Sequence, residues 1–434
     1  MRLARTEGAW ALAECAIEPY FNLVQRYVFA PYFAGTLAAT AAAGASVWGV
    51  ALGAAGLAIA LLAPLLGSIA DSGGRLRPWL MASSLTAFVA SASLWWAAPG
   101  SGLWTVAAAV AIGLVAVELL NMFVNASLSR AAARDRLGMV SSVGYAMSQV
   151  AGIAALLLIL VASSTVPALL PQVPAAVDRM AGPAAALFLL LVVPLLLLLP
   201  EPAAPGRLSP MAGLRALKAT LAEAWRVRDM RLFLLGRMLA ADGMTVVFSF
   251  GAVLAAASFG WGADTMVVFG FIITVFGVVG GFLGAWLDPR LGSHRLMLLG
   301  LLTLMVGTAS VILTDEARLV GIPTGVALSA PLASPQELGF LGSGAVVAIG
   351  AGFTLGAMRA VMAQLAPPAK MAAYFGLYAF VGKATAFVGP FLVSAIAAAT
   401  GTVRLGILVA VVFLALGFLL LSRVRVGATR QFAG

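Results

Sequence analysis

A stripe of polar side chains runs through the first apolar stretch of the chain, residues 10–34. At about 100° per residue they fall close to one face of a helix: Glu14, Glu18, Asn22, Gln25 and Arg26. A charge near the centre of a bilayer costs about 3 kcal/mol or more, so a simple membrane anchor does not account for them. Carboxylate, amide and guanidinium groups on one face indicate a binding surface for a charged or zwitterionic solute. For Glu14, nearest the end of the stretch, a rim position is the alternative.

Polar side chains also occur inside other apolar stretches, and we predict that they complete the substrate-binding surface: Asn121 and Asn125 in 103–128, Tyr145 and Gln149 in 137–163, Arg237 and Asp242 in 230–258, Arg359 in 338–365, and Tyr378 and Lys383 in 371–398. Glu18, Glu118 and Asp242 are the predicted proton carriers, because burial disfavours the charged form of a carboxylate. Two structural alternatives stay open. Arg237 and Asp242 could form a purely structural pair, and Arg359 could anchor a helix end.

The composition is that of an integral membrane protein. Of the 434 residues, 62% are hydrophobic and 10% are charged, whereas soluble domains carry about 25% charged residues. One cysteine excludes an internal disulfide, and one histidine argues against a histidine-based metal site. The amino terminus lacks the pattern of a cleaved signal peptide. No motif for metal-assisted, nucleophilic or ATP-driven chemistry stands out, so we expect neither an enzyme nor a cofactor.

The apolar stretches predict an all-α protein that crosses the membrane repeatedly. A helical span needs about 20 apolar residues, and twelve stretches qualify: 10–34, 44–70, 78–98, 103–128, 137–163, 182–200, 230–258, 265–287, 295–313, 338–365, 371–398 and 402–422. Residues 201–229 are proline-rich at first and then amphipathic, and they separate the sixth span from the seventh. We therefore expect two six-helix halves, 1–200 and 230–434, joined by a cytoplasmic linker.

The basic residues predict the orientation. If both termini and the even-numbered connections are cytoplasmic, that side holds 19 of the Lys and Arg residues and the opposite side holds 3. Both termini are then inside, and the expected location is the cytoplasmic membrane. The net charge of +10 is explained by topology, so nucleic-acid binding is not needed.

Two connections six spans apart repeat one pattern. "GSIADSGGRLRPW" contains Asp71, Arg75 and Arg77, and "GAWLDPRLGSHRL" contains Asp288 and Arg290. Repeated halves are typical of transporters. The first loop resembles the cytoplasmic signature of the major facilitator superfamily, which implies that these five residues form a conformational latch at helix ends. An ordinary positive-inside loop is the alternative.

Three longer segments resemble one branch of that superfamily. "WALAECAIEPYFNLVQRYVFAPYFAG", "FLLGRMLAADGMTVVF" and "GFTLGAMRAVMAQLAPPAKMAAYFGLYAFVGKATAFVGPFL" are similar to the first, seventh and tenth-to-eleventh helices of the unknown-major-facilitator family, which includes autophagy-related vacuolar effluxers. The resemblance implies a twelve-helix facilitator fold and solute transport, with amino-acid efflux known for the vacuolar members. Ile17-Glu18 replaces the family's usual Asn-Ser, which suggests a different substrate or coupling.

The buried charges favour a secondary transporter of a small polar metabolite. The spans hold four cations and four acids, and this balance of charge suits an organic anion or a zwitterion such as an amino acid. We expect a monomer in the bilayer, coupled to H+; Na+ is not excluded, since Asn and Ser oxygens could ligate it. An exporter of amphipathic compounds or lipids and a non-transporting assembly factor are the alternatives.

Overall fold

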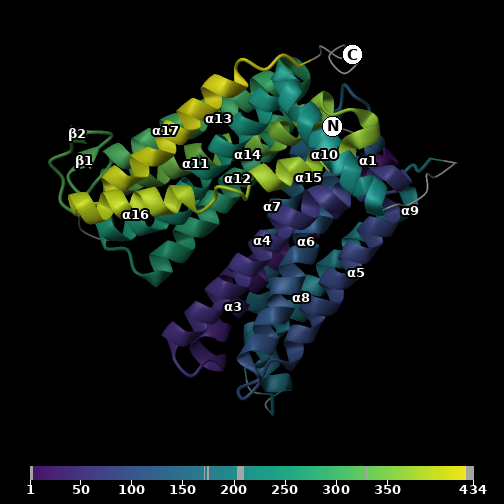
Figure 1. The fold of residues 1–434 in the computed structure, drawn as a ribbon. Helices are drawn as coiled ribbons and strands as arrows, with labels where there is room; N and C mark the ends of the chain where they lie inside the picture. The colour runs from purple at the N-terminus through teal and green to yellow at the C-terminus, as the bar shows by residue number, and fades with distance from the viewer. Residues whose placement is uncertain (1–2, 171, 174, 203–209, 329–330, 427–434) are drawn as a thin grey trace. The chain divides into compact units, whose positions relative to one another are not determined.

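A computed structural model describes residues 3–170, 172–173, 175–202, 210–328 and 331–426. The described chain is almost entirely helical (Figure 1), and it separates into two compact units. Unit 1 comprises residues 1–140, 147–220 and 367–380, and unit 2 comprises residues 141–146, 221–366 and 381–434. Residues 203–209, within the expected linker, lie outside the described residues.

Unit 1 contains most of the first ten helices and nearly all of a later one, α15. Its α-helices are α1 Arg5–Glu14, α2 Glu18–Tyr20, α3 Phe29–Tyr32, α4 Ala41–Gly73, α5 Arg77–Ser93, α6 Leu103–Ala131, most of α7 Leu137–Leu169, α8 Ala176–Leu189, α9 Val193–Leu198, the first part of α10 Pro210–Arg226, and most of α15 Met371–Val381. Its other helical turns are the π-helices η1 Phe21–Tyr27 and η2 Phe33–Leu37, and the 3-10 helices η3 Leu94–Trp96, η4 Leu190–Val192 and η5 Pro368–Lys370.

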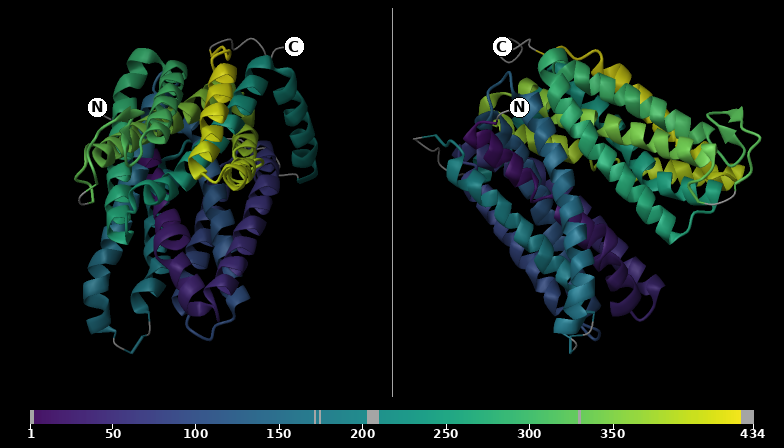
Figure 2. Two further views of the ribbon diagram at one scale, coloured as in Figure 1. Left: turned by 90° about the vertical axis from the view of Figure 1, so that its left-hand side faces the viewer. Right: turned by 180° about the vertical axis from the view of Figure 1, so that it is seen from behind.

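Unit 2 contains six further helices and a small hairpin. The helices are α11 Arg228–Phe259, α12 Ala263–Leu291, α13 Ser293–Leu313, α14 Pro335–Leu365, α16 Val388–Thr400 and α17 Val403–Leu421. The strands β1 Arg318–Leu319 and β2 Ile322–Pro323 pair antiparallel between α13 and α14, with Arg318 opposite Pro323. Figure 2 shows the helices of each unit from two further sides.

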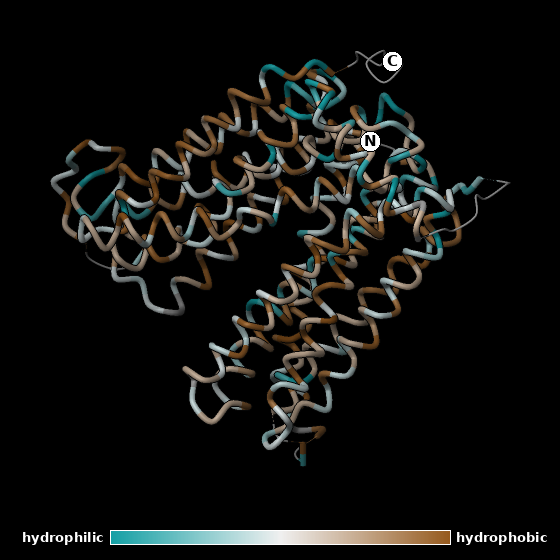
Figure 3. Tube along the Cα trace, in the orientation of Figure 1, coloured by the Kyte–Doolittle hydropathy of each residue, from teal (hydrophilic) through white to brown (hydrophobic). Residues whose placement is uncertain are grey.

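Nine helices in the described part of the chain are long and apolar enough to span a membrane. Their hydrophobic residues give the brown runs along the tube of Figure 3, with hydrophilic residues gathered mainly in the connections. The other three expected spans are present as shorter pieces. Span 78–98 forms α5 and η3, span 10–34 forms a series of α- and π-helical turns, and span 371–398 forms α15 and α16.

The break in the first span has a local cause in the sequence. Helix α1 ends at Glu14, and Pro19 occupies the first turn of α2. Because proline lacks an N–H, it is tolerated in a first turn but not in a helix interior. The helix accordingly breaks just before Pro19, between Glu14 and Glu18, and the π-helical turns of η1 follow α2 directly.

Two side-chain hydrogen bonds fix this broken span against α6. The Trp10 indole donates to the carbonyl oxygen of Val124 at 2.7 Å, and the Tyr20 hydroxyl donates to the carbonyl oxygen of Val110 at 2.8 Å. Both side chains are completely buried. Beside the second bond, a Cβ added to Gly113 would lie 2.8 Å from the Tyr20 oxygen. The absence of a side chain at that position lets the two segments approach closely.

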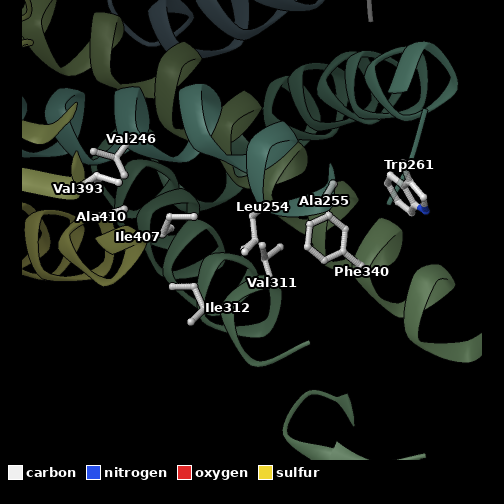
Figure 4. Packing of buried hydrophobic residues seen from close by; sticks show 10 residues of the cluster. All are labelled: Val246, Leu254, Ala255, Trp261, Val311, Ile312, Phe340, Val393, Ile407 and Ala410. Carbon is white, nitrogen blue, oxygen red and sulfur yellow. The ribbon is translucent and has the colours of Figure 1, made fainter. Parts of the chain in front are cut away.

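The buried core of unit 2 is apolar and partly aromatic. Val246, Leu254, Val311, Phe340 and Ile407 belong to it, and Figure 4 shows them with their neighbours. At its edge the indole of Trp261 lies with its ring centroid 5.8 Å from that of Phe340 in an edge-to-face arrangement, a favoured geometry for aromatic pairs.

Close to this core, a capping box begins α14. The Ser334 side chain accepts a hydrogen bond from the backbone N–H of Glu337, and the Glu337 carboxylate accepts one in return from the backbone N–H of Ser334. The Trp261 indole also donates to this carboxylate, at 2.7 Å. The Ser334 and Glu337 side chains thus satisfy backbone N–H groups at the start of the helix and fix where α14 starts.

Candidate functional site

The polar stripe of the first span forms a compact cluster in unit 1. One guanidinium nitrogen of Arg26 donates to the Glu18 carboxylate at 2.6 Å and to the Asn22 side-chain oxygen at 3.0 Å. The Glu18 side chain is 16% exposed and that of Arg26 is 47% exposed. The prediction that these three residues share a face is therefore confirmed, and they form one charge-assisted hydrogen-bonded group.

The backbone around this group is irregular. Asn22 and Arg26 lie in the π-helix η1, and Glu18 begins α2 just before it. π-Helical turns are rare and occur frequently at functional sites. At membrane depth, irregular backbone is tolerated where it is buried in protein or lines a water-filled space. The π-turns thus set the ion pair in the kind of backbone from which transporters build binding sites.

Helix α7 forms one wall of the cluster through a glycine. A Cβ added to Gly152 would lie 2.6 Å from the side-chain nitrogen of Asn22 and 2.9 Å from Cγ of Glu18. The backbone of α7 therefore touches both side chains directly. Sequence reasoning missed Gly152, since a glycine in an apolar helix gives no sign of what it approaches.

The structure places the other predicted residues of unit 1 on α6 and in the broken first span. On α6, Asn125 donates to the side-chain oxygen of Asn121 at 2.8 Å, one turn away, and Glu118 is half-buried. Gln25 is also half-buried, whereas Glu14 is 3% exposed.

Two more predicted residues lie on α7 and α15. Gln149 of α7 is half-buried, one turn before Gly152. Tyr378 is buried in α15, with its ring centroid 5.7 Å from that of Phe375.

A second polar cluster lies in unit 2, where the eleventh expected span is broken. Thr385 lies between α15 and α16, in a stretch that forms turns, and its hydroxyl donates to the Asp242 carboxylate at 2.6 Å. Asp242 is 3% exposed on α11 and also interacts electrostatically with Arg237. Lys383 belongs to the same turns and its side chain is exposed. Thr385 was missed, although it completes the Gly-Lys-Ala-Thr motif around Lys383.

Arg359 lies in a different part of unit 2. It is 8% exposed on α14 and donates to the carbonyl oxygen of Ser141 at 3.0 Å, while the Ser141 hydroxyl donates back to the carbonyl oxygen of Gly356 at 2.7 Å. These reciprocal bonds join α14 to the first residues of α7. Half-buried Tyr145 extends from the same segment towards α12, where a Cβ added to Gly277 would lie 3.8 Å from its hydroxyl.

Asp71, in the first repeated loop, caps the start of α15. Its two carboxylate oxygens accept hydrogen bonds from the backbone N–H groups of Ala372 and Ala373, at 3.1 and 2.7 Å, at the start of α15. A carboxylate there satisfies orphan donors and interacts favourably with the helix dipole. Gly67 permits this approach, because a Cβ there would lie only 2.3 Å from the Ala372 oxygen.

Glu201, which sequence reasoning missed, holds the backbone of this loop and one of its arginines. One Glu201 oxygen accepts from the backbone N–H groups of Leu76 and Arg77, at 2.8 and 2.9 Å. Arg75 and Arg130 approach the same carboxylate within 4.0 and 3.7 Å. Glu201 thus holds the end of the sixth span against this loop.

The second repeated loop makes different contacts. Asp288 is buried, while Arg290 is exposed and lies over the ring of Trp286 at 4.1 Å from its centroid. Separately, a cavity of about 640 Å³ in unit 1 is lined by apolar side chains such as Trp95, Val166 and Met180. Because it offers no polar group to orient a solute, we do not assign it to the transport site.

Comparison with solved structures shows the fold. The E. coli fucose:proton symporter FucP aligns with a TM-score of 0.71 and 14% identity over 96% of this chain and 97% of that chain. The human organic anion transporter MFSD10 aligns with a TM-score of 0.70 and 16% identity over 96% and 99%. The chain therefore has the twelve-helix fold of the major facilitator superfamily, and the fold expected from the sequence is confirmed.

The family follows from the sequence comparison. The family model described as "Vacuole effluxer Atg22 like" matches residues 129–433, so the chain belongs to this family of membrane transporters. Autophagy-related protein 22 of Yarrowia lipolytica is 28% identical over 196 residues, which cover 44% of this chain and 31% of that relative. The match thus spans about a third of the relative's length.

Proposed function

We propose that this protein is a proton-coupled secondary transporter of a small metabolite that carries a carboxylate, either an organic anion or a zwitterion such as an amino acid. It acts as a monomer by alternating access in the cytoplasmic membrane, with both termini in the cytoplasm. Membership of a transporter family and the facilitator fold support the general activity.

The observation that carries this proposal is the ion pair between Arg26 and Glu18, set in π-helical backbone. Guanidinium groups bind carboxylates through strong, directional hydrogen bonds. The Arg26 side chain keeps 47% of its surface exposed, so a substrate carboxylate can reach it. An incoming anion competes with Glu18 for the same guanidinium nitrogen.

Competition for Arg26 couples the anion to a proton. When the substrate carboxylate takes the guanidinium, Glu18 loses its cationic partner in a partly buried place, and its neutral form becomes favoured. Glu18 then takes up one proton. One proton enters with each monoanion, and this step adds no net charge. Release of substrate restores the Glu18–Arg26 pair and expels the proton.

We further propose that the polar cluster within unit 2 also binds substrate. Asp242 offers a carboxylate for an ammonium group, and Lys383 offers a cation for a second carboxylate. Both lie at or against the non-helical turns between α15 and α16. Glu118 and Asp242 are further candidates for proton carriers.

The test is flux into proteoliposomes containing the purified protein, first with a panel of amino acids, carboxylates and sugars. The Glu18→Gln variant keeps the shape of the side chain but cannot exchange a proton. We expect it to lose accumulation driven by a pH gradient while retaining exchange of substrate across the membrane. Glu316→Gln, in an exposed loop, is the matched control and should behave as wild type.

Two results would overturn the proposal. Gradient-driven accumulation that survives in both Glu18→Gln and Glu118→Gln would remove the coupling assignment. Stimulation by hydrophobic cations and not by any carboxylate would favour an exporter of amphipathic compounds. Flux measured in sodium-free buffer separates H+ from Na+ as the coupling ion.

A further inference from the structure

Helix α10, Pro210–Arg226, presents an unusual exposed surface between the sixth and seventh spans. Four large apolar side chains, between 44% and 60% exposed, project from it: Met211, Leu214, Leu221 and Trp225. At about 100° per residue they fall within about 80° of one another. They therefore form one continuous apolar stripe along the helix, and no part of the transport proposal uses it.

Basic side chains border this stripe on one side. Arg215, Lys218 and Arg226 are exposed, and by the same geometry they cover about 80° that overlaps one edge of the apolar stripe. Long cationic side chains next to an apolar surface can extend their charged ends towards phosphate groups while their stems stay apolar. This combination is typical of helices that lie in a membrane interface.

The other edge of the stripe faces protein. Gly213 packs against α4, where an added Cβ would lie 2.5 Å from a side-chain carbon of Ile69. Thr220 and Ala224, at 1% and 4% exposure, lie within about 40° of Gly213 around the helix. The helix thus has three faces: one buried against protein, one apolar and exposed, and one basic.

The position of α10 along the chain places it at the membrane surface. Only Val227, in an extended conformation, separates α10 from α11, which is long and apolar enough to span the membrane. Arg231 in the first turn of α11 donates to the carbonyl oxygen of Trp225 at 3.1 Å. The end of α10 is therefore tied to the start of a span, and its apolar stripe lies within reach of lipid.

We propose that α10 is an interfacial helix that binds anionic phospholipids of the cytoplasmic leaflet. Its apolar stripe enters the boundary between headgroups and acyl chains, and its three basic residues contact lipid phosphates. The cationic charge beside the stripe argues for a lipid of opposite charge as the occupant. The choice of leaflet rests on the orientation given with the proposed function; the binding itself does not.

The experiment uses the full chain in lipid nanodiscs and one fluorescent label. Cys15 is the only cysteine of the sequence and is buried, so Cys15→Ser gives a background without thiols, with Cys15→Ala as the substitute if folding suffers. A new cysteine replaces Leu221 in the apolar stripe. The matched control replaces Ala219, which is exposed on the same helix but about 160° away. Each label is then quenched by lipids with brominated acyl chains.

We expect at least two-fold stronger quenching at Leu221→Cys than at Ala219→Cys, with a larger difference in phosphatidylglycerol than in phosphatidylcholine. Replacing Arg215, Lys218 and Arg226 with Gln should abolish that dependence on anionic lipid. Equal quenching at both positions would overturn the proposal, because the helix would then have no oriented face in the membrane. Weak quenching at both positions would overturn it as well, since water or protein would then cover the stripe. Because no flux is measured, failure here is separate from failure of the transport proposal.

Discussion

Thr385, in the non-helical turns between α15 and α16, donates a 2.6 Å hydrogen bond to the buried carboxylate of Asp242. The hydroxyl thus joins the turns around Lys383 to α11. Within the described residues the other Asp242 oxygen, Oδ1, is buried and accepts no hydrogen bond. A carboxylate held by one donor, with its second oxygen unused, is suited to receive a proton or an ammonium group.

Replacing this hydroxyl tests its role. Thr385→Val keeps the shape of the side chain but removes the donor, and a hydrogen bond to a charged group contributes about 1.5–3 kcal/mol. We predict at least a ten-fold fall in the initial rate of substrate flux. Thr385→Ser keeps the donor and should retain most of the wild-type rate. A loss of rate in Thr385→Ser with none in Thr385→Val would mean that the methyl group, not the hydroxyl, matters.

Arg26 should govern the affinity for substrate. In Arg26→Gln the guanidinium that binds the substrate carboxylate is absent, so we predict that KM rises about ten-fold or more. Arg26→Lys keeps the charge but loses the planar set of N–H donors of the guanidinium group, so an intermediate KM is expected. Arg318→Gln, in the hairpin between α13 and α14, is the control. An unchanged KM in Arg26→Gln would remove this residue from the binding site.

Gly152 should tolerate no side chain. An alanine there brings its Cβ within 2.6 Å of Asn22, so Asn22 or α7 must shift, and overpacking of this kind costs about 1–3 kcal/mol. We predict that Gly152→Ala lowers both the rate of flux and the unfolding temperature. Gly56→Ala on α4, where a Cβ meets nothing within 4 Å, is the matched control. Wild-type behaviour of Gly152→Ala would show that the close approach to α7 is not needed.

The cap on α15 should contribute to stability. Asp71→Ala removes the acceptor for the N–H groups of Ala372 and Ala373, and loss of a helix cap costs about 1 kcal/mol. We predict a lower unfolding temperature in detergent, and a smaller decrease for Asp71→Asn, which keeps one acceptor oxygen. If Asp71→Ala unfolds at the same temperature as wild type, the cap contributes nothing measurable.

Much of the fold follows from apolar periodicity, because the bilayer demands long apolar helices with internally satisfied backbones. The irregular segments were less predictable. Pro19 favours a break in the helix, whereas nothing local predicts the π-turns after it, which accompany the contacts of Trp10 and Tyr20 with α6. The break around Lys383 lies just before Gly389 and Pro390 in the first turn of α16, a signal that our expectation of one continuous span, 371–398, did not use.

The candidate site was predictable in part for a similar reason. Glu18, Asn22 and Arg26 stand out because charge in an apolar stretch is costly, and helical spacing alone brings them together. Gly152, Thr385 and Glu201 contribute through contacts with residues distant in sequence. A glycine, a threonine or a carboxylate at a helix end is too common a residue for its role to be seen without the fold.

The most direct test of the central claim is accumulation of substrate in proteoliposomes under an imposed pH gradient, compared between wild type and Glu18→Gln. With Glu18 as the proton carrier released by substrate at Arg26, wild type accumulates substrate above equilibrium, and Glu18→Gln only equilibrates it at a measurable rate. Accumulation by Glu18→Gln equal to that of wild type would contradict the account.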